Sequence, residues 1–145
     1  NMPKLLYIVF TELTLLLLFA ANSNAADLTV NILGLRNSKG DVHIALYDNP
    51  KAFPSSNHML REVNKLITNR KTEYRFTNLT PGYYALAAYH DENGNDSFDT
   101  NFLRLPTEGY AFSNDAQAFL GPPSFLNAQI ALKLEGSTTH IKMGY

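Results

Sequence analysis

The fold is decided by the stretch Phe76-Thr77-Asn78-Leu79-Thr80-Pro81-Gly82-Tyr83-Tyr84-Ala85-Leu86. We expect a strand to end at Phe76, Leu79 to turn into the core and Pro81-Gly82 to reverse the chain, because proline and glycine favour turns. Tyr84 then opens the next strand. This order is typical of a tyrosine corner, in which a ring closes one end of a β-sandwich while its hydroxyl group bonds to nearby backbone.

Alternation of apolar and polar residues on both sides of this stretch predicts further strands. The predicted strands cover residues 28–33, 42–47, 62–67, 74–76, 84–89, 128–134 and 138–143. We expect the first two to form a hairpin across the turn cluster Asn37-Ser38-Lys39-Gly40. The segment 62–67 also fits one face of a helix together with Met59, and we favour a strand because a turn at residues 68–71 follows it.

Seven or so short strands with turn signals between them indicate an all-β fold, an antiparallel immunoglobulin-like β-sandwich of seven to eight strands. Residues 102–127 are rich in proline, glycine, asparagine and aromatic residues, and we expect them to form one long ordered loop. No internal repeat or interdomain linker interrupts the sequence, so residues 26–145 are expected to form a single domain.

The first 25 residues have the pattern of a secretory signal peptide. Lys4 supplies a short positive region, residues 5–21 are mostly apolar, and Ser23-Asn24-Ala25 offers small residues for cleavage. A membrane anchor is the alternative, because about 20 apolar residues are enough to span a bilayer. Glu12 interrupts the run and no basic cluster follows it, so we favour removal and a periplasmic, secreted or cell-surface protein.

The chain has 145 residues, a formal net charge of −1 and no cysteine. Scattered charges close to neutrality give no electrostatic reason to expect binding to nucleic acid, or stable membrane insertion once the signal is removed. The lack of cysteine excludes thiolate zinc ligands, a cysteine nucleophile and disulfides, so packing must stabilise the fold.

A polar loop with oxygen-bearing groups at alternate positions directly follows the predicted strand 84–89. Its candidate metal ligands are Asp91, Asn93, Asn95, the Ser97 carbonyl group and Asp99. Carboxylates and amides in this order are typical of loops that bind a hard cation such as calcium, although Asp96 and Phe102 stand where an EF-hand has glycine and glutamate. A metal-free turn held by bonds between side chains and backbone is the alternative.

The chain contains four histidines: His43, His58, His90 and His140. None shares metal-ligand spacing with another, so we expect surface or packing roles, with His43 and His140 facing outward from strands. The serine motifs of hydrolases are absent. An enzyme that uses His90, Asp91 or Glu108 is an alternative, with Asp99 and Glu108 meeting across the loop.

Six aromatic residues lie in and beside the long loop: Phe98, Phe102, Tyr110, Phe112, Phe119 and Phe125. Rings exposed at the edge of a sandwich form platforms for sugars or peptides. The ligand surface that this interpretation predicts contains Phe98, Phe102, Glu108 and Tyr110. The interpretation that we favour is that the rings anchor the loop, because a loop of about 25 residues without regular structure needs anchors or a function.

Several separated motifs resemble known families. The corner Phe76-x-x-Leu79-x-Pro81-Gly82-x-Tyr84 resembles that of prealbumin-like sandwiches, including carboxypeptidase regulatory domains. Further motifs are His90-Asp91-Glu92-Asn93-Gly94-Asn95, Asp99-Thr100-Asn101-Phe102, Glu108-Gly109-Tyr110, Phe112-Ser113-Asn114 and Gly121-Pro122-Pro123-Ser124-Phe125. In this order they resemble a family of small exported bacterial proteins, domain of unknown function 2141. The resemblance covers nearly all of residues 27–145 and implies an exported β-sandwich, with no catalytic residues to transfer.

Three residues depart from that family's pattern where glycine is expected: Asp96, Arg104 and Ala111. Each places a side chain where we expect the backbone to adopt positive φ, which favours glycine. Asp96 is the mildest case, because aspartate visits the left-handed region more readily than most residues.

Together these features predict an exported, noncatalytic binding or structural module. Its expected partner is an unknown protein or glycan, and calcium is the one cofactor that the sequence suggests. Two alternatives stay open: a small hydrolase-like enzyme that uses the 90–108 loop, and a small-molecule carrier that resembles transthyretin.

Overall fold

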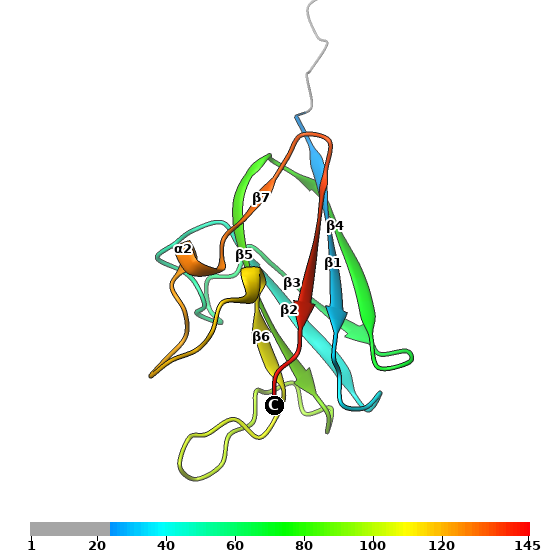
Figure 1. The fold of residues 1–145 in the computed structure, drawn as a ribbon, viewed down its shortest axis with the longest axis vertical. Coiled ribbons are helices and arrows are strands. Elements are labelled where there is room, and N and C mark those ends of the chain that lie inside the picture. Colours follow the sequence, from blue (N-terminus) through cyan, green and yellow to red (C-terminus); the bar gives the residue numbers. More distant parts are fainter. Residues whose placement is uncertain (1–23) are drawn as a thin grey trace, which may run out of the picture.

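The computed structural model describes residues 24–145, which form two β-sheets packed face to face (Figure 1). The prediction of an all-β sandwich is confirmed. The predicted signal peptide, residues 1–25, lies almost entirely outside the described residues, so its removal stays a prediction. None of the helices in the described part of the chain has the length and apolar character needed to cross a membrane.

Three strands form the first sheet: β1 (Ala26–Leu33), β4 (Thr72–Leu79) and β8 (Ser137–Lys142). β1 lies between its two neighbours and pairs antiparallel with β4 but parallel with β8. The second sheet contains β2 (Asp41–Tyr47), β3 (Arg61–Leu66), β5 (Gly82–Asp91), β6 (Tyr110–Phe112) and β7 (Ile130–Leu132). β2 pairs with β3 and β5, and β6 and β7 pair with different parts of β5.

The core lies between the sheets and follows the period of two expected for strands. In β1 the buried residues are Ala26, Leu28, Val30 and Ile32. They pack in one cluster with residues of the second sheet, among them Val42, Ile44, Leu46 and Leu86. Burial of a large aliphatic side chain contributes about 1.5–3 kcal/mol, so this apolar layer is the main source of stability.

The tyrosine corner forms as predicted. The Tyr84 hydroxyl group donates a hydrogen bond of 2.6 Å to the Thr80 carbonyl oxygen. Phe76 and Leu79 are buried in the core cluster on the other side of the turn. The corner therefore joins the first sheet to the second through β4 and β5.

The predicted hairpin between residues 28–33 and 42–47 is wrong. β1 and β2 lie in different sheets, and β2 pairs with β3 and β5 instead. The alternation that predicts both strands says which side chains face the core, but it does not say which edges pair. Here the two apolar faces pack against each other across the sandwich, so residues 34–40 cross from one sheet to the other.

The long loop contains more regular structure than expected. β6, the 3-10 turn η1 (Ser113–Asp115) and the short helix α2 (Phe125–Ala128) all lie within or next to residues 102–127. Asp96 and Arg104 adopt φ values of 58° and 61°, as expected from their glycine-like positions. Ala111 instead lies inside β6, so the expectation of positive φ is wrong there, because strand pairing with Ala88 holds it extended.

Anchoring of the long loop by its aromatic side chains is confirmed for only part of the set. Phe125 is buried, and Phe112 packs against the same small cluster, which covers the outer face of the second sheet and contains Tyr47 and Ala85. Phe102 and Phe119 are 92% and 85% exposed, so their rings do not anchor the loop.

Candidate functional site

A cleft of about 720 Å³ lies on the outer face of the second sheet. Its apolar lining includes Tyr47, Met59, Tyr89, Phe98, Tyr110 and Phe112. Polar side chains also reach it, chiefly those of His43, Ser56, Glu62 and Asp96. Alternation along β2 and β5 explains the position of the cleft, because residues two apart share a face and the core takes the other set.

A row of rings forms one wall of the cleft. Tyr89 stacks on its cross-strand partner His43, with ring centroids 4.4 Å apart and planes at 17°. Phe98 follows at 5.5 Å from Tyr89, and Tyr110 at 5.8 Å from Phe98. The row continues to Phe112, 6.1 Å from Tyr110. Aromatic pairs at these separations attract one another beyond simple burial, so the wall is held in place.

The hydroxyl groups of Tyr47 and Tyr89 on this face are held in their neutral form. Desolvation by burial is the main cause that raises the pKa of Tyr47 to about 12, and the same cause raises the pKa of Tyr89 further. The carboxylates nearby, Glu62 among them, act in the same direction. Tyr47 also donates a hydrogen bond of 3.2 Å to the Ser55 carbonyl oxygen, which ties the 52–59 segment to β2.

Asp91, the first of the predicted calcium ligands, is fully buried and faces backbone N–H groups. Its Oδ1 accepts hydrogen bonds from Gly94 and Asn95 at 2.7 and 3.1 Å, and its Oδ2 accepts one from Asp96 at 2.7 Å. Burial acts to raise the pKa of Asp91, but the three N–H groups outweigh it and hold the pKa below its usual value.

The other predicted calcium ligands bond to one another and to the loop backbone. The side-chain amides of Asn93 and Asn95 donate to the Asp99 carboxylate at 2.7 to 3.1 Å. The oxygens of the same two amides accept the N–H groups of Asn95 and Ser97. The loop thus has the arrangement of the metal-free turn, and the alternative of calcium binding stays untested.

The residues of the hydrolase alternative are buried and bonded to the protein itself. His90 donates from Nε2 to the Lys39 carbonyl oxygen at 2.7 Å, and its Nδ1 lies 2.7 Å from the Tyr145 hydroxyl oxygen. Glu108 accepts the N–H groups of Glu92 and Asp99, each at 3.1 Å. Asp99 and Glu108 do meet, but through the backbone of Asp99.

Only two of the four residues of the predicted ligand surface line the cleft. Phe98 and Tyr110 line the cleft. Phe102 does not line it and is an exposed ring, and Glu108 is buried against residues 91–101, here called the acidic loop. The sequence reasoning missed Tyr47, Met59 and Tyr89. The outward positions of Tyr47 on β2 and Tyr89 on β5 were the available signal, whereas Met59 lies in the irregular 52–59 segment and gave none.

A cluster of charged groups at one end of the cleft was also missed. His43, expected to face outward, does lie on the outer face, but Tyr89 and the acidic loop bury it to 5% exposure. Asp41, Glu62, Asp91 and Asp96 all place a carboxylate oxygen within 3.5 Å of its ring nitrogens. The signal was Asp41-x-His43, since residues two apart on a strand share a face.

Comparison with known proteins places the chain in a family. A family model described as "Uncharacterized protein conserved in bacteria (DUF2141)" matches residues 30–142. Searches of curated proteins and of solved structures give no match. The matched residues include strands of both sheets, the acidic loop and all residues that line the cleft. The chain therefore belongs to the DUF2141 family of bacterial proteins.

Proposed function

We propose that the protein is an exported, noncatalytic binding module that holds a glycan in the cleft on the outer face of the second sheet. The observation that carries the proposal is the row of rings from Tyr89 to Phe112 along a cleft of about 720 Å³. Ligand sites typically enclose about 300–1,000 Å³ and combine apolar walls with a few polar groups.

The chemistry of the cleft suits a sugar better than a purely apolar ligand. Aromatic faces stack on the apolar faces of sugar rings, while carboxylates accept hydrogen bonds from hydroxyl groups. Glu62 and Asp96 bring such carboxylates to the cleft lining. A noncatalytic role is supported by the way that His90, Asp91 and Glu108 are occupied with backbone and Tyr145 partners. Export rests on the sequence pattern of residues 1–25 alone.

The proposal is tested by affinity measurements with a matched pair of variants. Purified protein is titrated calorimetrically with a panel of soluble chito-, cello- and malto-oligosaccharides. Phe98→Ala removes a ring that lines the cleft, and we expect at least tenfold weaker binding of any oligosaccharide that the wild type takes. Phe102→Ala removes an equally large ring from the same loop, outside the cleft, and we expect binding within twofold of wild type.

Two results would overturn the proposal. Equal effects of the two variants would show that binding, where it occurs, does not use the cleft. No binding to any oligosaccharide, together with saturable binding to an extended peptide library that depends on Phe98, would replace the glycan by a peptide.

A further inference from the structure

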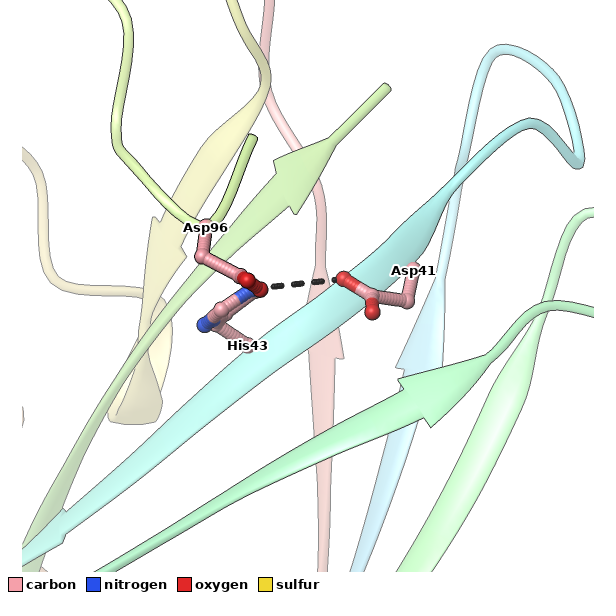
Figure 2. Close-up of side chains that lie close together, drawn as sticks. All are labelled: Asp41, His43 and Asp96. Carbon is pink, nitrogen blue, oxygen red and sulfur yellow. Dashed lines mark ion pairs between the residues drawn. The ribbon is translucent and has the colours of Figure 1, made fainter. Parts of the chain in front are cut away.

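The charged cluster at the end of the cleft has the composition of a metal centre. We propose that Asp41, His43 and Asp96 bind a divalent transition-metal ion, with zinc as the representative ion. One ligand atom from each of the three side chains lies within 4.8 Å of the other two. Figure 2 shows Asp41 and His43 on β2, with Asp96 reaching them from the loop after β5. The site rests on these contacts and not on the proposed glycan binding.

Two buried atoms of the cluster lack partners. Within residues 24–145, neither His43 Nε2 nor Asp41 Oδ1 has a hydrogen-bond partner, and both atoms are shielded from solvent. A buried polar group left without a partner destabilises the folded state. Because His43 Nε2 and Asp41 Oδ1 are only 3.3 Å apart, a cation bound between them would satisfy both at once.

The hydrogen bond on the far side of the His43 ring prepares Nε2 for a metal. Glu62 Oε1 lies 3.3 Å from Nδ1. An ionised carboxylate can only accept, so Nδ1 can donate to Glu62, and Nε2 is then the nitrogen that would bind the ion after giving up any proton that it shares with Asp41 and Asp96. Metal-ligating histidines generally donate their other N–H group to a carboxylate or carbonyl in this way. Stacking on Tyr89 fixes the plane of the ring.

The separations suit ligands of one small ion. His43 Nε2 lies 3.3 Å from Asp41 Oδ1 and 3.5 Å from Asp96 Oδ1. Zinc bonds of about 2.0–2.1 Å in a tetrahedron place neighbouring ligand atoms about 3.3–3.4 Å apart. A further oxygen, Asp91 Oδ2, lies 3.5 Å from the same nitrogen. Imidazole nitrogen favours zinc, copper or nickel over calcium, which prefers oxygen ligands only.

Repulsion between the carboxylates around His43 also favours a bound cation. Asp41 and Asp91 are direct partners in the β2–β5 pairing, and like charges in that position oppose each other. Gly40 makes the close approach of β2 feasible, because a Cβ there would lie 1.8 Å from the Asp91 carbonyl oxygen. Asp96 adds a third carboxylate to the cluster, with its Oδ1 3.5 Å from His43 Nε2. A bound cation would offset these repulsions.

The test is calorimetric titration of the metal-free full-length protein with Zn²⁺ alone, beside Ca²⁺. We expect one Zn²⁺ per chain and tenfold or weaker affinity for Ca²⁺. His43→Ala should weaken Zn²⁺ binding at least 100-fold. Its matched control is His140→Ala, an exposed histidine on β8, which should change the affinity less than twofold.

A second variant covers the case in which His43→Ala fails to fold. Asp96→Asn changes a side chain that is 74% exposed and keeps a residue that tolerates positive φ, so the fold should survive. We expect at least tenfold weaker Zn²⁺ binding and an unchanged circular dichroism spectrum. Zn²⁺ binding that is equal in wild type, His43→Ala and Asp96→Asn would overturn the site. So would failure of the wild type to bind Zn²⁺ below 1 mM.

Discussion

The acidic loop gives a sharp prediction, because a single buried carboxylate holds it together. Asp91→Ala removes the acceptor of three backbone N–H groups, at 2.7, 3.1 and 2.7 Å. Hydrogen bonds to a charged group contribute about 1.5–3 kcal/mol each, but residues 94–96 are exposed and water replaces part of the loss. At about 1 kcal/mol for each bond, we expect the free energy of unfolding to fall by about 2–4 kcal/mol.

The matched control is Asp99→Ala, in the same loop. The Asp99 carboxylate accepts only the side-chain amides of Asn93 and Asn95, which are exposed. Its loss should lower the free energy of unfolding by less than about 1 kcal/mol, because solvent replaces these bonds readily. Urea unfolding, followed by far-UV circular dichroism, measures both variants. If Asp91→Ala costs no more than Asp99→Ala, Asp91 does not organise the loop and the reasoning is refuted.

Three further predictions concern the acidic loop and the tyrosine corner. The pKa of Asp91 in the folded protein lies below the value of about 3.9 in the unfolded chain. The ionised Asp91 carboxylate therefore stabilises the fold above about pH 3.9, and this stabilisation is lost as pH falls through the folded pKa. Urea unfolding at pH 6 and pH 3 should therefore show a larger acid loss for wild type than for Asp91→Asn; an equal loss would contradict the depressed pKa. Millimolar calcium should leave the melting temperature unchanged, because the Asp91 and Asn93 oxygens already accept backbone N–H groups; a calcium-dependent rise that Asp91→Ala and Asp99→Ala abolish would favour an ion instead. Tyr84→Phe should lower the free energy of unfolding by about 1 kcal/mol, because it removes the 2.6 Å bond to Thr80; an unchanged urea midpoint would show that the corner bond is not stabilising.

The fold was predictable wherever short-range sequence determines it. The tyrosine corner depends on residues within one turn, so Tyr84 and Thr80 form the expected bond. Strand pairing depends on residues far apart, and alternation is the same whichever edge a strand joins. The prediction of a β1–β2 hairpin was therefore wrong, and no local sequence pattern indicates the parallel pairing of β1 with β8. β6, with its three residues, is too short for alternation to reveal.

The candidate site was predictable to a smaller extent. The acidic loop was recognisable because its carboxylate and amide side chains lie close together in sequence. Phe98 and Tyr110 were predicted as surface rings. Asp41 and His43 share a strand, but Asp96 joins them only because β5 pairs with β2 and the next loop folds back over the sheet. Exposure also distinguishes rings that look alike in sequence: Phe98 packs between Tyr89 and Tyr110, while Phe102 contacts solvent.

Nuclear magnetic resonance mapping locates ligand binding on the molecule without prior choice of a site. Backbone amide shifts of the isotope-labelled protein are followed during titration with the oligosaccharide that binds best. We expect the largest changes around His43 and Tyr47 on β2, Tyr89 on β5, Phe98 in the loop, and β6, because these line the cleft. Shift changes confined to the first sheet or to the exposed rings of Phe102 and Phe119 would contradict the assignment of the cleft as the binding site.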